Sequence, residues 1–88
     1  MTNKMKIPVL ITNIQLRQDK NGQDYWIIST QFEQQTKSYL AFSQDYNLSP
    51  QAQSMLINNS RQLKDKRALL TIQKRGEREK VIDLEIKK

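Results

Sequence analysis

Residues 37–56, KSYLAFSQDYNLSPQAQSML, contain the change of pattern that decides the fold. The first residues alternate with the two-residue period of a β-strand. Ser49 and Pro50 then favour a helix start, because Ser caps the first turn and Pro fits its first position without losing a needed hydrogen bond. We therefore predict a strand over 36–43 and a short helix over 49–60. A stripe at helical spacing supports the helix and continues past its end, namely Ala52, Met55, Leu56, Asn59 and Leu63. The polar residue Asn59 weakens this stripe.

Two further strands are predicted before this segment, over 6–18 and 24–33. In the first, the apolar positions change from odd to even between Ile7 and Leu16, which indicates a β-bulge. Between the two strands, Asn21-Gly22 is a dipeptide that accepts the positive φ angles of a tight hairpin turn.

The face of each strand follows from this alternation. In the strand 24–33 the more apolar face carries Trp26, Ile28, Thr30 and Phe32, which we assign to the core. A turn over residues 33–35 leads to the strand 36–43, where Leu40 and Phe42 share one face. Lys37, Tyr39 and Ala41 share the other face, which we expect to point outward.

Two strands are predicted after the helix, over 66–75 and 80–87, joined by a charged turn. The first has one apolar face made of Ala68, Leu70 and Ile72, and the second has an inward face made of Ile82, Leu84 and Ile86. Three strands, a helix and two more strands can close into a small barrel, since closure removes exposed sheet edges. The chain of 88 residues is then one domain over 1–88.

The composition excludes several classes of chemistry. With no Cys, the chain has no disulfide, thiolate metal site or cysteine nucleophile, and with no His it lacks the commonest general base and metal ligand. We expect no enzyme and no cofactor. No apolar run reaches the length of a membrane span or resembles a signal peptide, so we expect a cytoplasmic protein that does not bind membranes.

The net charge of +6 is concentrated in the last third of the chain. Residues 1–60 carry a formal charge of +1, whereas residues 61–88 carry ten basic and five acidic side chains. This asymmetry favours a polyanionic partner such as nucleic acid, although a charged surface can also serve solubility alone.

The strand count, the helix after the third strand and the bulged first strand resemble the OB-fold, a five-stranded barrel that binds oligonucleotides and oligosaccharides. The resemblance covers residues 6–87 and is one of architecture, since this fold has no diagnostic motif. The small size, the basicity and the many Gln and Asn residues resemble small single-stranded DNA-binding proteins of plasmids, phages and other mobile elements.

The resemblance implies a ligand across the second and third strands, flanked by two turns. The residues it selects are Arg17 and Lys20 near the first turn, Lys74, Arg75, Arg78 and Lys80 near the last turn, and Tyr25, Trp26, Lys37 and Tyr39 on the sheet between them. Aromatic rings stack on bases and cations neutralise phosphates. Tyr25 and Trp26 point to opposite faces, so only one of them reaches a ligand. Tyr39, on the predicted outward face, is the better candidate for stacking.

The carboxylates Asp83 and Glu85 lie two apart on one strand face and are candidates for a shared metal, but we expect them to pair with cations on neighbouring strands. The leading functional hypothesis is non-catalytic binding of single-stranded nucleic acid, most readily DNA, as an accessory to DNA replication or mobile-element maintenance. Self-association, or docking on a polymerase, primase or helicase, would add affinity.

The alternative function is that of a protein-binding subunit of such a replication enzyme. An exposed patch of Ile27, Val81 and Tyr39 would favour it. A different small barrel of the SH3-like type is a third reading, against which the predicted helix argues.

Overall fold

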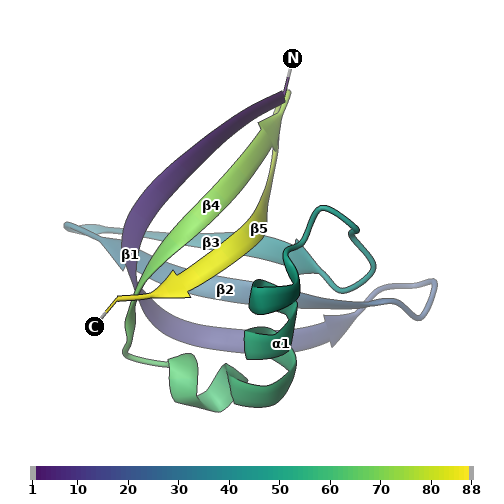
Figure 1. Cartoon of the computed structure of the whole chain (residues 1–88), viewed down its shortest axis with the longest axis horizontal. Helices are drawn as coiled ribbons and strands as arrows, with labels where there is room; N and C mark the ends of the chain where they lie inside the picture. The colour runs from purple at the N-terminus through teal and green to yellow at the C-terminus, as the bar shows by residue number, and fades with distance from the viewer. Residues whose placement is uncertain (1, 88) are drawn as a thin grey trace.

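The computed structural model describes residues 2–87 and consists of five strands, one α-helix and a short 3-10 helix (Figure 1). Their order confirms the predicted sequence of three strands, a helix and two strands. The elements are β1 (Thr2–Gln18), β2 (Asp24–Phe32), β3 (Gln35–Phe42), α1 (Pro50–Asn59), η1 (Ser60–Leu63), β4 (Arg67–Arg75) and β5 (Arg78–Ile86). The 3-10 helix was not predicted, and β1 begins four residues earlier than expected.

The five strands form one closed sheet in the order β1-β2-β3-β5-β4, with β4 pairing back onto β1. β1 pairs with two strands: residues 2–10 pair with β4, and residues 10–18 pair with β2. The closure between β3 and β5 is parallel and consists of one register pair, Leu40 with Lys80. The sheet is therefore closed by a narrow seam between these two strands.

The predicted bulge and the predicted turns before β2 and before β5 are present, but the first turn is wider than the tight turn that Asn21-Gly22 predicts: it spans residues 19–23, and only Gly22 of the dipeptide has a positive φ. The register between β1 and β2 shifts between Ile11 and Asn13, which is where the apolar positions change parity. Gly22 has φ 82 in the β1–β2 turn, where the Asp19 carboxylate accepts hydrogen bonds from the backbone N–H groups of Asn21 and Gln23. Gly76 has φ 63 as the first of two turn residues between β4 and β5, a position where Gly is favoured.

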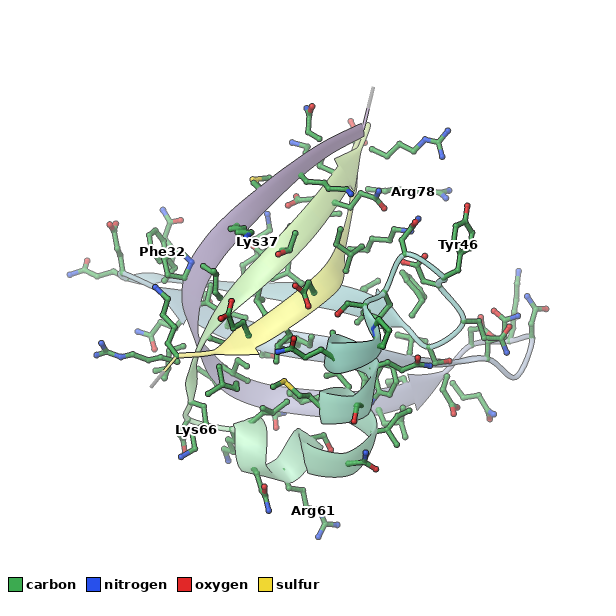
Figure 2. The ribbon with its side chains drawn as sticks, in the orientation of Figure 1. Phe32, Lys37, Tyr46, Arg61, Lys66 and Arg78 are labelled. Atoms are coloured by element: carbon green, nitrogen blue, oxygen red, sulfur yellow. The ribbon has the colours of Figure 1, made fainter. Side chains whose placement is uncertain are left out.

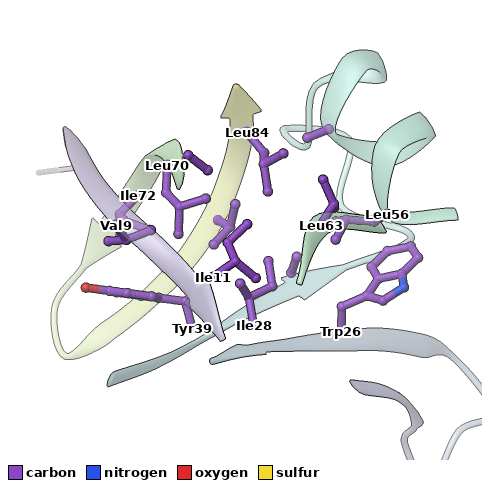
Figure 3. Close-up of a cluster of buried hydrophobic side chains, with 14 of the residues drawn as sticks. Val9, Ile11, Trp26, Ile28, Tyr39, Leu56, Leu63, Leu70, Ile72 and Leu84 are labelled. Carbon is purple, nitrogen blue, oxygen red and sulfur yellow. The ribbon is translucent and has the colours of Figure 1, made fainter. Parts of the chain in front are cut away.

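The core fills the inside of the closed sheet and extends beneath the helix (Figure 3). Ile11, Ile28, Leu70, Ile72 and Leu84 are fully buried at its centre. At the other end it is completed by side chains from the helical segment, namely Leu48, Ala52, Leu56 and Leu63. Trp26 packs beside Leu56 and Leu63 in Figure 3 and is 4% exposed, which confirms its assignment to the core.

The helix begins where the sequence predicts. Ser49 is the N-cap, its Oγ accepting a 3.0 Å hydrogen bond from the backbone N–H of Ala52, and Pro50 is the first helical residue. The backbone N–H of Ser49 also donates to the carbonyl of Ile82 at 2.7 Å. The start of α1 is thus fixed to β5.

The predicted facing of β3 is wrong. Tyr39 and Ala41 are buried inside the sheet, whereas Leu40 is half-buried and Phe42 exposed on the outside. The cause is the turn before β3, which has two residues, Glu33 and Gln34, instead of the expected three. A shift of one residue in register moves every side chain of a strand to the opposite face.

The predicted facing of β5 needs a smaller correction. The register between β4 and β5 shifts so that Ile72 pairs with Val81 and Thr71 with Asp83, which leaves Ile82 as an extra residue. Val81 consequently joins the core together with Leu84, although it was expected outside, while Ile82 is buried outside that cluster. Phe32 also departs from the prediction, since it is 44% exposed at the end of β2.

Candidate functional site

A cleft of about 970 Å³ runs along the seam between β3 and β5, and we call it the β3–β5 cleft. Its walls come from β3, from the loop between β3 and α1, and from the β4–β5 hairpin, while Gln23 reaches it from the β1–β2 turn. The cleft exists because β3 and β5 share one register pair and diverge on either side of it.

Half of the predicted site residues line this cleft, namely Lys37, Tyr39, Arg75, Arg78 and Lys80. They come from β3 and from the β4–β5 hairpin. In the sequence, α1 and η1 lie between these two elements. Tyr39 contributes although it is only 6% exposed, so it forms part of the cleft floor instead of the outward stacking face that the sequence predicted.

The other five predicted residues lie outside the cleft. Trp26 is in the core, and Tyr25 lies half-buried on the outer face of β2. Arg17 and Lys20 are exposed near the β1–β2 turn, where the Arg17 guanidinium donates to Gln15 Oε1 at 3.3 Å. Lys74 is exposed near the end of β4.

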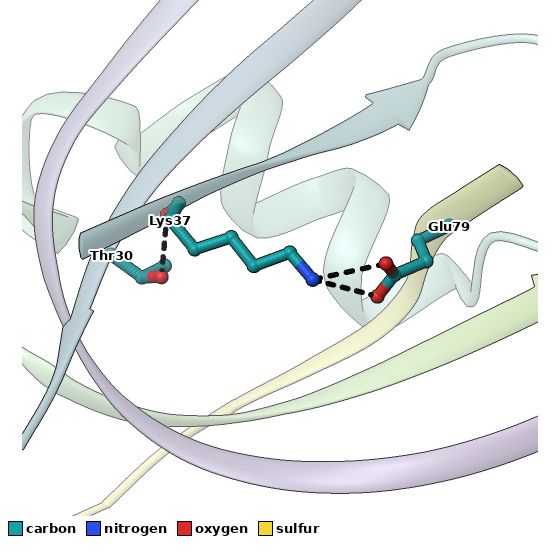
Figure 4. Close-up of polar contacts among 3 residues, drawn as sticks. All are labelled: Thr30, Lys37 and Glu79. Atoms are coloured by element: carbon teal, nitrogen blue, oxygen red, sulfur yellow. Dashed lines mark hydrogen bonds and ion pairs between the residues drawn. The ribbon is translucent and has the colours of Figure 1, made fainter. Parts of the chain in front are cut away.

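Lys37 and Glu79 form an ion pair across the seam (Figure 4). The Lys37 ammonium lies 3.0 Å from Glu79 Oε1 and 3.2 Å from Oε2, and 5.1 Å from the centre of the Tyr39 ring. The hydrogen bond to Glu79 raises the pKa of Lys37 above its ordinary value. Lys37 is therefore charged at neutral pH, but its charge is partly neutralised by Glu79.

A second ion pair joins β5 to the loop between β3 and α1. Lys80 Nζ lies 2.9 Å from Asp45 Oδ2, and the Asp45 carboxylate is 8% exposed. The other oxygen, Asp45 Oδ1, accepts a 3.0 Å hydrogen bond from the backbone N–H of Asn47. The ion pair and this hydrogen bond hold the loop against the cleft wall, although the buried Asp45 Oδ2 has no partner of hydrogen-bond geometry among residues 2–87.

Arg75 and Arg78 are the cleft cations without an ion pair among residues 2–87. They face each other directly across the two-residue turn of the β4–β5 hairpin. Like charges directly opposite each other in antiparallel strands are destabilising. An anion bound between the two guanidinium groups would remove that repulsion.

The outer face next to the cleft carries an aromatic pair that sequence reasoning missed. Phe42 lines the cleft and is 38% exposed, and its ring centre lies 6.0 Å from that of Tyr25 on β2. Leu40 and Ile27 are the next register pair on the same face. A two-residue turn at Glu33-Gln34 is the signal that would have placed Phe42 outside, because it sets Phe42 opposite Tyr25.

Two other features were also missed. Lys4 and Lys6 lie beside Gln73 and Thr71 of β4, so the start of β1 adds exposed cations next to the hairpin. The closure of β4 onto β1 is the signal that would have found them. Tyr46 is 94% exposed between Asp45 and Asn47, on the loop that borders the cleft (Figure 2).

The acidic pair on β5 does not behave as expected. Asp83 accepts a hydrogen bond from the Ser49 hydroxyl, and its register partner is Thr71, while that of Glu85 is Leu69. Neither carboxylate forms an ion pair within the described part of the chain. Residues 2–87 also contain no group of three or more acidic side chains placed to hold a metal ion.

Comparisons with protein-family models, curated proteins and solved structures give no match to this chain. None of the helices within residues 2–87 has both the length and the apolar composition needed to cross a membrane. The candidate site therefore rests on its own geometry: a basic, aromatic-edged cleft at the seam of a closed five-stranded sheet.

Proposed function

We propose that this chain is an OB-fold protein that binds single-stranded nucleic acid, with DNA as the first candidate, along the β3–β5 cleft. The closed five-stranded sheet with a helix between β3 and β4 supports the fold assignment, because OB-folds share this arrangement. Their ligands lie over the second and third strands and between the loops that correspond to the β1–β2 and β4–β5 turns. The β3–β5 cleft overlaps part of that region, since β3, the β4–β5 hairpin and Gln23 of the β1–β2 turn line it, whereas no residue of β2 does.

The observation that carries the proposal is the facing pair Arg75 and Arg78 on the wall of the β3–β5 cleft, which an exposed aromatic side chain, Phe42, also lines. The two guanidinium groups provide a place for backbone phosphate, and neutralising phosphate releases counterions. Phe42, supported by Tyr25, offers a ring for base stacking, which tolerates any base sequence. Phosphate contact and stacking together are what single-strand binding requires.

Binding of this kind needs no catalytic group, and we propose an accessory role in DNA replication or in maintenance of a mobile element. A single OB-fold covers about 4 to 16 nucleotides. Self-association or contact with a polymerase, primase or helicase would therefore raise its working affinity.

The alternative of a pure protein-binding subunit predicted an exposed patch of Ile27, Val81 and Tyr39. Val81 is fully buried and Tyr39 is 6% exposed, so this patch does not form. A different apolar group does lie on the outer face of β2 and β3, where the exposed Phe42 adjoins Tyr25 and the pair Ile27 and Leu40. We favour nucleic-acid binding because the facing cations Arg75 and Arg78 line the same cleft as Phe42.

The test is a fluorescence-anisotropy titration of the protein against labelled single-stranded and duplex oligonucleotides at about 50 and 200 mM salt. We expect tighter binding to the single strand and a clear loss of affinity at the higher salt. Absence of binding at about 50 mM salt, or an equal affinity for the duplex, would overturn the proposal.

A further inference from the structure

The start of β1 presents two lysines on the outside of the closed sheet. Val9 and Ile11 of this strand are buried inside the sheet. Because side chains alternate between the two faces of a strand, Lys4 and Lys6 point to the outside. Both are exposed.

The end of β4 and the start of β5 continue the same outer face. Leu70 and Ile72 are buried inside the sheet, which puts Gln73 and Arg75 on the outside of β4. Arg78 of β5 lies directly opposite Arg75 in the register, so its side chain is on the same face. These three outward residues all line the β3–β5 cleft. The wall of the cleft therefore reaches the outer face of β4.

Gln73 links this wall to β1, because it lines the cleft and is also the register partner of Lys4. Arg75 lies two residues beyond Gln73, which makes it a diagonal neighbour of Lys4 at a distance of about 7 to 8 Å. Arg75 and Arg78, directly opposite each other, are about 5 Å apart. Lys4 and Lys6 are about 7 Å apart along β1. The four cations form a continuous row, which we call the outer cation row: Arg78, Arg75, Lys4 and Lys6.

The protein itself does not neutralise the outer cation row. None of its members forms an ion pair within residues 2–87. Asp83 and Glu85 share this outer face but lie on β5, with β4 between them and Lys6, and Asp83 already accepts a hydrogen bond from the helix cap. Successive members of the row are at most about 8 Å apart, less than the Debye length of about 10 Å at 0.1 M salt, so they repel one another. An anion with several charges along the row would relieve this repulsion.

We propose that a single strand bound in the β3–β5 cleft leaves it over Arg75 and continues along the outside of β1, where Lys4 and Lys6 each contact a phosphate. This inference rests on the proposed function and extends it to a surface away from the second and third strands, where OB-fold ligands lie. β1 and β4 contain no aromatic residue, so the contact here is with phosphate and carries no information on base sequence. The ligand that fits the row is a strand longer than the cleft.

Lys4 and Lys6 also lie at a free edge of the sheet. Residues 2–9 of β1 pair with β4 alone, and Pro8 is typical of such an edge because it has no N–H to donate. Lysines at an edge prevent pairing with the edge of another chain. That role does not explain why the row continues onto β4 and β5, and it predicts no effect of the two lysines on a bound strand.

The test compares two strand lengths, about 4 and about 16 nucleotides, which are the limits for one OB-fold. At about 3.4 Å per stacked nucleotide the longer strand measures about 54 Å. It exceeds the longest extent of the molecule, 34 Å, and so continues beyond the cleft. Anisotropy titrations between about 50 and 200 mM salt give the slope of log affinity against log salt for each length.

For the longer strand, Lys4→Gln/Lys6→Gln should reduce this slope by about 1.4, because two phosphate contacts are lost at about 0.7 each. For the shorter strand, which Phe42 holds at the cleft, the slope should not change. Lys4→Arg/Lys6→Arg keeps both charges and should bind both strands as the unaltered protein does.

The matched control is Lys64→Gln/Lys66→Gln, which makes the same charge change at exposed positions that do not line the cleft. Figure 2 shows Lys66 on the far side of the molecule from Arg78. The control should leave both slopes unchanged.

An unchanged slope for the longer strand in Lys4→Gln/Lys6→Gln, with a reduced slope in Arg75→Ala/Arg78→Ala, would overturn the extended path and leave the proposed function intact. An equal reduction in the control would also overturn it, since general charge would then explain the effect. An equal reduction for both strand lengths would place the two lysines at the cleft itself and overturn the continuation along β1. No binding of either strand to the unaltered protein would overturn the proposed function as well.

Discussion

The Ser49 hydroxyl donates a 2.6 Å hydrogen bond to Asp83 Oδ1 while accepting one from the backbone N–H of Ala52. One side chain therefore caps α1 and also links it to β5 by a hydrogen bond. Since β5 also forms one wall of the β3–β5 cleft, Ser49 connects the start of the helix to the strand that carries this wall.

Replacing Ser49 with Ala removes both hydrogen bonds and should lower the free energy of unfolding by about 1 to 2 kcal/mol. Ser54→Ala on the exposed side of the same helix is the control, with an expected change within about 0.5 kcal/mol. Urea unfolding followed by Trp26 fluorescence measures both. Equal midpoints for the two variants would contradict the double role of Ser49.

Glu33→Gly should stabilise the protein by about 0.5 to 1 kcal/mol. Glu33 has a left-handed backbone that costs about 1 to 2 kcal/mol in a residue with a Cβ, and Gly removes this cost. Part of the gain in stability is lost because Gly makes the unfolded chain more flexible. The opposite change, Gly22→Ala, should destabilise the protein because Gly22 has φ 82, a conformation that strains an Ala backbone. The added methyl group meets open space, so backbone strain and not a clash would be the cause. A lower urea midpoint for Glu33→Gly would show that the Glu33 side chain contributes more than its strain costs.

Glu79→Gln should strengthen binding of single strands about two- to fivefold at low salt. The change removes one negative charge from the β3–β5 cleft and releases Lys37 from its ion pair, and exposed charge pairs contribute up to about 1 kcal/mol. Glu85→Gln makes the same charge change on β5 outside the cleft, so it should have a smaller effect. Anisotropy titrations measure the affinity of both variants for the same single strand. An equal increase in affinity for the two variants would mean that the net charge of the protein, and not the position of Glu79, causes the effect.

Phe42→Ala should weaken single-strand binding by about 1 to 3 kcal/mol with little change in its salt dependence, because stacking involves no counterion release. Leu16→Ala, at an apolar position that is 60% exposed, controls for general loss of apolar surface. Unchanged affinity of the Phe42 variant would remove this ring from the site.

Arg75→Ala/Arg78→Ala should flatten the salt dependence of single-strand binding. Each lost phosphate contact reduces the slope of log affinity against log salt by about 0.7 on a single strand. The same double variant should be no less stable than the unaltered protein, since it removes a repulsive cross-strand pair. A slope that stays the same would place the phosphate contacts elsewhere.

The order of the elements and the bulge in β1 were predictable because their signals are local. The parity change between Ile7 and Leu16 and the dipeptide Ser49-Pro50 each lie within a few residues of the feature they specify. The same holds for the burial of Trp26.

The facing of β3 and β5 was not predictable from those signals. A turn of two residues instead of three before β3 exchanged the positions of Tyr39 and Phe42. In β5 the extra residue of the bulge is Ile82, which follows Val81. Because both residues are apolar, the alternation of apolar and polar residues does not show which of them faces the core. The predicted site and the β3–β5 cleft therefore share β3 and the β4–β5 hairpin, but the exposed aromatic side chain of β3 is Phe42 and not Tyr39.

The division of β1 between two partners has a consequence for folding kinetics. Its second half pairs with β2, a neighbour in the chain, but residues 2–10 pair with residues 67–75. The hairpin of β1 and β2 can form early, whereas the sheet closes only after the two ends of the chain meet. Long-range contacts of this kind slow folding, so we expect the pairing of β4 with β1 to limit the folding rate. Small barrels fold in roughly milliseconds to seconds, and we expect this protein to do the same. During synthesis, the β1 edge then stays open until β4 has left the ribosome.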